Sequence, residues 1–269
     1  MRVMIFSGSH PRHSFVHKAI LESDLECAAV IMEREDLVPE PPLGIPQNDR
    51  DNFIRHFQER DNVESRIFGK ASSQEVFCNI PTLYCQSEDL NTNATVEFVN
   101  FFKPDWAFIF GVDLIKDPLL SLLPKDKVNL HLGLSPWYRG SATLFWPFYF
   151  LQPQYAGVTF HQIVPEADAG DIIHQSVPEI KFGDGIHDVS ARAVVRAKHD
   201  LIKLVSIYKE RAKWDLYKQK SSGCLFLSKF FQPEHLRVIY ELYDDDIVDY
   251  YLNNKTTEDN PLLFKQPGM

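Results

Sequence analysis

The sequence predicts an α/β fold, in which a Rossmann-like, mostly parallel and twisted sheet is flanked by helices and followed by a short, mainly helical C-terminal extension. Two observations predict this class. Apolar, β-favouring runs alternate with helix-like segments through the first half of the chain. These runs are almost continuously apolar, which is typical of parallel strands buried on both faces. Parallel strands joined through helices require right-handed crossovers.

The strands and helices of the first half follow from these runs. A first strand is predicted over residues 2–7, ending at Gly8, and Ser14 is expected to cap the helix that follows. Later elements are strands at 27–32, 80–85, 106–110 and 127–131, and a helix at 92–102. Residues 34–73 are rich in proline and charge and contain a polar helix at about 51–67, so we interpret them as an insertion.

The second half is predicted to close the domain and add the extension. An aromatic helix is expected at 144–151, a long helix at about 188–212, and between them two strands, 157–164 and 172–180, pairing antiparallel around the turn at 166–170. We therefore expect a catalytic domain over residues 1–212 and an extension over 213–269, with one or two helices at 233–252. Four apolar residues among acidic ones in this extension predict a homodimer: Tyr240, Leu242, Ile247 and Tyr250.

Composition excludes several classes of protein. A hydrophobic content of 44% with 24% charged residues is ordinary for a soluble protein. The formal net charge of −9 argues against nucleic acid as a partner, although a local basic pocket could still bind a small anion. The four cysteines show no zinc or disulfide spacing, and we expect no metal. The first strand begins at once and no apolar run could span a bilayer, so we expect a cytoplasmic protein without a membrane partner.

Polar residues gather where the strand at 127–131 ends. Asn129 and His131 are two apart, so in a strand they point to the same side. They precede a loop rich in Gly, Ser, Pro and Arg, and Asp168 follows in the turn Ala-Asp-Ala-Gly-Asp. Each residue also has a plainer interpretation, because strand ends tolerate polar side chains and Asp-Ala-Gly-Asp is good turn chemistry. Taken together, their order and spacing favour a catalytic site.

Asn129 and His131 followed by Tyr138-Arg139-Gly140, with the Asp168 turn about 30 residues later, resemble the 10-formyltetrahydrofolate-dependent formyltransferase family. The resemblance is good over about 100–215 and limited to a strand-loop-helix pattern over about 1–35. It implies 10-formyltetrahydrofolate as cosubstrate and Asn129, His131 and Asp168 as catalytic residues. It also implies that the folate is held by two loops, formed by Phe110, Gly111, Val112 and Leu114 and by Val164, Pro165, Glu166 and Ala167.

The sequence departs from the family at two places near the site. Gly133 stands where a Ser is usual, and Ala167 where a Leu is usual. We expect both to affect the shape of the pocket and not the chemistry. His161 and His174 lie in predicted strands and are interpreted as structural.

The three candidate catalytic residues meet the demands of formyl transfer to an amine. Asn129 can donate a hydrogen bond to the developing oxyanion, which is worth about 3–4 kcal/mol for a well-placed donor. A protonated His131 can donate a second one and move a proton to the departing nitrogen. Asp168 would raise the pKa of His131, orient it, and accept the proton that the amine loses. No metal is needed.

The loop before the first helix is the candidate site for the acceptor. Its backbone N–H groups, the helix dipole and its basic side chains could bind a phosphate, and in the family this region faces the acceptor. The candidate residues are Ser7, Gly8, Ser9, His10 and Arg12, joined by Trp137 and Arg139 near the catalytic set. The alternatives are that Arg12 is simply exposed, that Arg139 anchors its loop and that Trp137 is core.

Three acceptors compete. Methionyl-tRNA enzymes usually carry a C-terminal β-barrel where this chain has a short acidic extension, and glycinamide ribonucleotide enzymes lack such an insertion and tail. A nucleotide-linked amino sugar is therefore favoured, in the biosynthesis of a surface polysaccharide such as lipopolysaccharide. A formyltetrahydrofolate deformylase, which typically has an N-terminal regulatory domain, and a non-catalytic folate- or nucleotide-binding scaffold remain alternatives.

Overall fold

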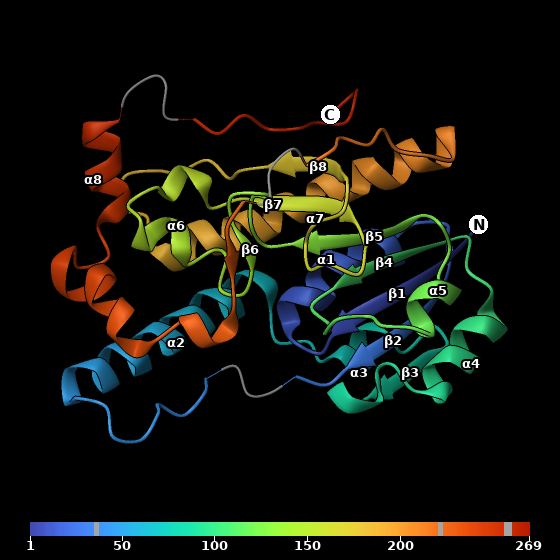
Figure 1. Cartoon of the computed structure of the whole chain (residues 1–269), viewed down its shortest axis with the longest axis horizontal. Coiled ribbons are helices and arrows are strands. Elements are labelled where there is room, and N and C mark those ends of the chain that lie inside the picture. The colour runs from blue at the N-terminus through green and yellow to red at the C-terminus, as the bar shows by residue number, and fades with distance from the viewer. Residues whose placement is uncertain (35–37, 220–222, 256–259) are drawn as a thin grey trace.

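A seven-stranded sheet forms the centre of the protein (Figure 1). The computed structural model describes residues 1–34, 38–219, 223–255 and 260–269. The strand order is β3-β2-β1-β4-β5-β7-β8. The strands are β1 (Arg2–Gly8), β2 (Glu26–Met32), β3 (Thr82–Cys85), β4 (Trp106–Phe110), β5 (Lys127–His131), β7 (Val158–Gln162) and β8 (Ile172–Ser176). Neighbouring strands from β3 to β5 are parallel, and β7 is antiparallel to both β5 and β8. The predicted fold class is confirmed.

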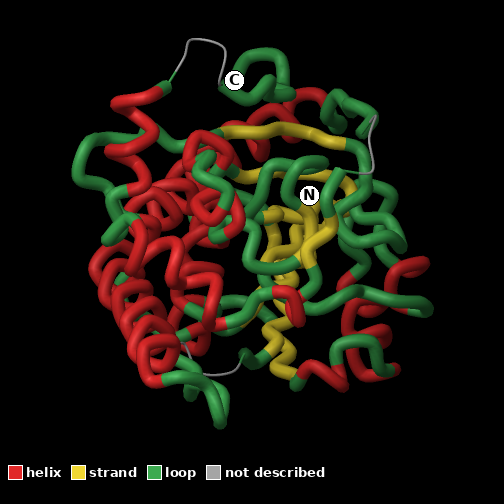
Figure 2. Tube along the Cα trace, turned by 60° about the vertical axis from the view of Figure 1, so that its left-hand side comes forward, coloured by secondary structure: helices red, strands yellow, loops and turns green. Residues whose placement is uncertain are grey.

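Helices cover both faces of this sheet (Figure 2). On β1, Val3 and Ile5 belong to the core shared with α1 (Pro11–Leu21) and α7 (Ile186–Arg211). The alternate residues Met4 and Phe6 face the other way, toward α4 (Asn93–Phe102) and α5 (Leu119–Leu122). All four side chains are fully buried. This two-sided burial is why the strand is continuously apolar in sequence.

The first helix begins earlier than predicted. The cap position before α1 is His10, and Pro11 fills the first helical position, where its missing N–H costs nothing. Ser14 lies inside the helix and is buried, so its predicted capping role is wrong. The aromatic helix is also shorter than predicted, with α6 spanning Trp146–Tyr149.

The insertion and the C-terminal extension pack against each other. The insertion forms α2 (Gln47–Phe68), which is longer than predicted, and it is followed by α3 (Ser73–Val76). Arg237 of the extension donates two hydrogen bonds of 2.6 Å to the buried carboxylate of Asp49 on α2. In Figure 1, α2 lies beside the orange and red C-terminal segments. The polar helix is therefore part of the body of the protein.

The extension is mainly helical, as predicted. It holds 3-10 turns at Ser228–Phe230 and Pro233–His235, a π-helical turn at Val238–Leu242 and α8 (Ile247–Asn254). It also supplies β9 (Leu225–Phe226), which pairs in parallel with β6 (Arg139–Gly140) in a second small sheet. Two further 3-10 turns lie elsewhere, at Ser87–Asp89 and Pro153–Tyr155. Pairing with β6 brings the extension onto the loop that follows β5.

The apolar residues that predicted a homodimer divide into two groups. Tyr240 and Ile247 are buried in the core that the extension shares with α2 and α6. Leu242 and Tyr250 remain exposed, by 71% and 46%. The first pair thus completes the fold of a single chain, and the homodimer stays a prediction that rests on the second pair. Within the described ranges, no helix has both the length and the apolar character that crossing a bilayer requires.

Candidate active site

A cavity of about 980 Å³ lies at the carboxyl ends of β4 and β5. Open α/β sheets bind ligands at this edge, where the strands give way to loops. One part of the wall comes from residues 109–115 and 129–132, which end these two strands. Other parts come from α1, α2, α7 and the extension at residues 225–231. Segments distant in sequence therefore share one cavity.

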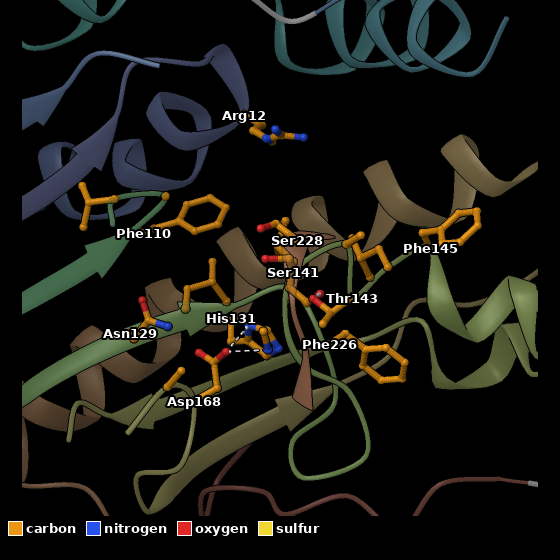
Figure 3. Close-up of a pocket in the computed structure, with 18 of the residues that line it drawn as sticks. Arg12, Phe110, Asn129, His131, Ser141, Thr143, Phe145, Asp168, Phe226 and Ser228 are labelled. Atoms are coloured by element: carbon orange, nitrogen blue, oxygen red, sulfur yellow. Dashed lines mark hydrogen bonds and ion pairs between the residues drawn. The ribbon is translucent and has the colours of Figure 1, made fainter. Parts of the chain in front are cut away.

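Asn129, His131 and Asp168 all line this cavity (Figure 3). Nδ1 of His131 lies 3.4 Å from Oδ2 of Asp168, a contact that Figure 3 marks with dashed lines. Both side chains are largely buried, with 7% and 14% of their surface exposed. The structure thus brings together the three residues that the sequence singled out.

The hydrogen on His131 can be assigned from its surroundings. Nε2 lies 2.8 Å from the carbonyl oxygen of Tyr138, which can only accept, so Nε2 carries a hydrogen and donates it. In the neutral ring Nδ1 then carries no hydrogen, and its lone pair is directed toward Asp168. Such a nitrogen is a proton acceptor.

Burial keeps the His131 ring neutral. Desolvation lowers the pKa of His131, and the raising effects of Asp168 and of the Tyr138 carbonyl are smaller, so the pKa lies below its usual value of 6.5. Asp168 thus raises the pKa of His131 as expected, but burial lowers that pKa by more, so the net shift is downward. Burial raises the pKa of Asp168, yet His131, His161 and the Gly140 N–H together hold it well below its usual range.

Asp168 is held in an unusual backbone conformation. Its φ is 50°, in the left-handed region that non-glycine residues rarely adopt. The Gly140 N–H donates to Oδ2 at 2.8 Å, and the Gln219 side chain donates to the Asp168 carbonyl oxygen at 2.9 Å. Left-handed residues of this kind persist where surrounding contacts fix them, and they cluster at active sites.

His161 belongs to this site, although the sequence suggested a structural role. Its Nε2 lies 3.2 Å from the Asn129 amide nitrogen and 3.3 Å from Oδ1 of Asp168. Its Nδ1 donates to the carbonyl oxygen of Gln162 at 2.8 Å. In the sheet, His161 is the register partner of Asn129 across the antiparallel β5–β7 pair. That register is the signal that would have identified it.

Gly133 also has a closer relation to the site than predicted. A Cβ atom there would lie 2.5 Å from Nε2 of His131 and 2.5 Å from the carbonyl oxygen of Tyr138. The residue therefore borders the hydrogen bond that orients the imidazole, and its effect is not limited to the shape of the pocket.

Nearly all residues of the two predicted folate loops line the cavity. Its lining includes Phe110, Gly111, Val112, Leu114, Val164, Glu166 and Ala167. Pro165 is the one predicted folate residue outside this lining. Gly111 has a φ of 83°, and a Cβ there would meet the His13 ring at 2.4 Å, so this close turn requires glycine.

The predicted acceptor loop is mostly turned away from the cavity. Of its residues, Arg12 alone lines the cavity. The Ser7 hydroxyl donates to the Gly8 carbonyl, a Cβ on Gly8 would meet His13, and His10 stacks on the same ring. The Ser9 hydroxyl accepts from the backbone of Arg34. Because α1 begins at Pro11, the loop is too short to reach further.

The two other predicted acceptor residues anchor loops. The Trp137 ring packs against Tyr155, 5.5 Å between centroids, and does not line the cavity. The Arg139 guanidinium donates to the carbonyl oxygen of Ala167 at 2.6 Å and thereby fixes the turn that presents Asp168. Both positions match the plainer interpretations of these residues.

Residues 1–205 match the formyl transferase family. The chain belongs to the formyl transferase family. The match spans most of the chain and includes Asn129, His131 and Asp168. The resemblance found in the sequence is confirmed, and the protein is an enzyme that transfers formyl groups.

Solved formyl transferases share this fold. An N-formyltransferase from Helicobacter canadensis, in complex with folinic acid and dTDP-3-aminofucose, is 15% identical with a TM-score of 0.58, over 89% of this chain and 80% of that one. A 4-N formyltransferase from Francisella tularensis is 16% identical with a TM-score of 0.55, over 85% of this chain and 76% of that one. A phosphoribosylglycinamide formyltransferase from Anaplasma phagocytophilum is 15% identical with a TM-score of 0.55, over 84% of this chain and 97% of that one. At these identities the likeness is one of fold.

Proposed function

We propose that this protein transfers the formyl group of 10-formyltetrahydrofolate to the amine of a nucleotide-linked amino sugar. The observation that carries the proposal is the arrangement of Asn129 and the His131–Asp168 pair on the wall of one cavity. A cavity of about 980 Å³ lies at the upper end of the range for small-molecule sites. We further propose that the reaction serves surface polysaccharide biosynthesis, such as that of lipopolysaccharide, in the cytoplasm.

The residues beside Asn129 fit a reduced folate. The apolar side chains of Ile109, Ile115 and Ile163 line this end of the cavity, and loops at 110–114 and 164–167 add backbone N–H and C=O groups. A flat, polar-edged ring needs this combination of apolar walls and backbone hydrogen bonds. When bound, 10-formyltetrahydrofolate supplies an electrophilic formyl carbon on nitrogen.

Asn129 is the residue that we propose stabilises the formyl oxygen. Its amide nitrogen carries two hydrogens, and one of them faces Nε2 of His161 at 3.2 Å. The second can be donated to the oxygen as negative charge builds on it during attack by the amine. A donor fixed in advance costs no reorganisation, and its loss typically costs about 3–4 kcal/mol of transition-state stabilisation.

His131 and Asp168 act together on the proton of the attacking amine. The neutral ring presents its Nδ1 lone pair, and the proton moves onto this nitrogen as the new C–N bond forms. The ionised Asp168 carboxylate, 3.4 Å away, stabilises the imidazolium that results. The departing folate nitrogen then takes that proton. In this scheme His131 begins as a base, whereas the sequence suggested that it begins as an acid.

Two observations favour a sugar nucleotide as acceptor. The insertion helix α2 and the extension supply part of the cavity wall, and both lie outside what a glycinamide ribonucleotide enzyme was expected to carry. Formyltransferases of the same fold include the one from Helicobacter canadensis, whose structure holds a dTDP-linked amino sugar.

The test is release of tetrahydrofolate from 10-formyltetrahydrofolate by the purified protein. We expect release with dTDP- or UDP-linked amino sugars and none with glycinamide ribonucleotide, methionyl-tRNA or buffer alone, and mass spectrometry should find the formamido sugar. Release without an amine would instead indicate a deformylase. Lack of release with every acceptor would contradict formyl transfer and favour a scaffold.

A further inference from the structure

The cavity has a second part, away from Asn129, in which the sequence assigned a role to Arg12 alone. We call this part the α2 compartment, and define it by lining residues from α1, α2, α7 and the extension: Arg12, His56, Phe57, Arg60, His187 and Lys229. Figure 3 shows Arg12 reaching in from α1, on a different wall from Asn129 and Asp168. Aromatic contacts connect α2 to the other elements of this wall. The ring centroids of His56 on α2 and His187 on α7 lie 4.5 Å apart, and those of Phe57 on α2 and Phe231 in the extension lie 6.4 Å apart.

The α2 compartment is positively charged in an acidic protein. Among its described residues, three cations (Arg12, Arg60 and Lys229) face one cavity-lining carboxylate, that of Glu64, which lies 2.8 Å from Arg12. Arg34, another cation of the cavity, is paired with Asp113 at 2.9 Å. The compartment therefore has an excess of two positive charges in a chain whose net charge is −9. Such a patch concentrates anions.

Arg60 is the least solvated of these cations. Its guanidinium lies over the Phe57 ring, 4.6 Å from the centroid. Burial and the nearby Arg12 lower the pKa of Arg60 to about 10, and Glu64 and Asp61 only partly offset this. The group stays charged at neutral pH, and an anion bound beside it in low dielectric would be held more strongly than on the surface.

His56, Tyr240 and His187 form a hydrogen-bonded chain. With the Tyr240 hydroxyl as donor, Nε2 of His187 accepts its hydrogen at 3.4 Å. That hydroxyl oxygen then accepts from Nδ1 of His56 at 2.9 Å. Burial holds the pKa values of both rings below the usual value. Nε2 of His56 is left as a hydrogen-bond acceptor for whatever enters the cavity.

We propose that the α2 compartment binds the nucleoside diphosphate part of the acceptor, with its phosphates between Arg12, Arg60 and Lys229. The proposal rests on the proposed function, because it assigns the nucleotide of that acceptor to specific residues. A sugar nucleotide carries two negative charges on its diphosphate, which matches the excess charge of the compartment. The Phe231 ring offers an apolar surface to the base, and His56 accepts a hydrogen bond from its N–H or from a ribose hydroxyl.

Binding of free nucleotides tests this without catalysis. Isothermal titration calorimetry would measure the affinity of the full-length protein for UDP, dTDP, GDP and CDP, and separately for 5-formyltetrahydrofolate. The variants are Arg60→Met, Lys229→Ala and His56→Phe. The control is Arg66→Met, which makes the same change on the same helix at an exposed position outside the cavity.

We expect at least one of the four nucleotides to bind, and Arg60→Met to weaken it by about 10- to 100-fold, as loss of a charge-assisted contact does. Lys229→Ala, at an exposed position that tolerates change, should weaken it by about 3- to 10-fold. Affinity for 5-formyltetrahydrofolate should stay the same in every variant, which also shows that each is folded.

Two results would overturn the inference. One is that none of the four nucleotides binds; the other is that they bind equally to Arg60→Met, Lys229→Ala and Arg66→Met. Formyl transfer to an amino sugar nucleotide that is unaffected by Arg60→Met would overturn the inference and leave the proposed function intact. Nucleotide binding that depends on Arg60 but occurs without any formyl transfer would support the inference and overturn the proposed function.

Discussion

A Cβ atom on Gly133 would lie 2.5 Å from Nε2 of His131, closer than real Cβ contacts allow. Nε2 of this imidazole and the Tyr138 carbonyl oxygen, which are hydrogen-bonded to each other, occupy the space that a side chain would need. Gly133 thus permits the ring orientation in which Nδ1 faces Asp168. The departure from the usual Ser is coupled to how His131 is held.

Gly133→Ala should therefore displace the imidazole. The added methyl group forces either the ring or the 134–138 loop to move by a few tenths of an ångström or more, and misplaced catalytic groups lose about 10- to 100-fold in rate. We expect kcat to fall by at least about tenfold while KM for 10-formyltetrahydrofolate changes little. Steady-state kinetics of formyl transfer would measure both. Gly183→Ala is the control for a glycine change far from the site, because its φ of 81° strains the backbone while no atom lies near its Cβ. A normal kcat in Gly133→Ala would contradict this coupling.

Asn129→Ala and His131→Ala should each lower the turnover number by at least about a hundredfold. The first removes the donor to the formyl oxygen, and the second removes the proton acceptor beside Asp168. Circular dichroism and the melting temperature should show that both variants fold. The matched controls are Asn79→Ala and His199→Ala, which change exposed residues of the same types. Near-normal turnover in either site variant would refute the role assigned to that residue.

The central sheet could be predicted closely because its strands are buried on both faces. The strands at 106–110 and 127–131 were predicted to the residue, since continuous apolar runs have few other interpretations. The capping role predicted for Ser14 is wrong, because the helix begins three residues earlier. Pro11 occupies its first position and marks its start.

The site was only partly predictable, because two of its features depend on long-range packing. His161 meets Asn129 through the register of β5 and β7, which no local pattern of residues fixes. Arg60 lies on a helix whose polar sequence suggests a solvated surface. It faces a cavity because Asp49 of that helix binds Arg237, nearly 190 residues later in the chain. Sequence reasoning therefore identified three residues that meet at the cavity but not their neighbours across the fold.

His161→Ala should impair catalysis by releasing the two side chains that it holds. Asn129 loses its fixed partner and Asp168 loses a neighbouring imidazole that lowers its pKa, so we expect kcat to fall by about tenfold and KM for folate to change less. The acid limb of the kcat profile should also shift, which a purely structural defect would not cause. His161→Gln should recover part of the rate, because a Gln amide can bond both neighbours. An unchanged pH profile together with no recovery in His161→Gln would exclude a positioning role.

Acid should destabilise the protein at a pH where most carboxylates are still ionised. Burial lowers the pKa of five histidines: His13, His17, His56, His131 and His187. In the unfolded chain these residues titrate near 6.5, so below that pH the unfolded state binds more protons and the free energy of unfolding falls. Between pH 7.5 and 5.5, a histidine whose pKa in the folded protein lies far below this range costs about 1.4 kcal/mol of stability. Asp245, whose pKa burial raises to about 6, opposes this slightly, because the folded state gains a proton there.

Urea unfolding at pH 7.5 and 5.5 would measure the loss. Asp168, whose pKa is lowered, contributes stability that is lost only below about pH 3.9, outside this range. His17 is the best single test, because its ring is fully buried against Phe77 and Phe108, and its pKa is lowered to about 3. His17→Leu should reduce the difference between the two pH values by about 1.4 kcal/mol, whereas the exposed His199→Leu should leave it unchanged. Equal stability of the unaltered protein at both pH values would mean that these rings are charged in the folded state.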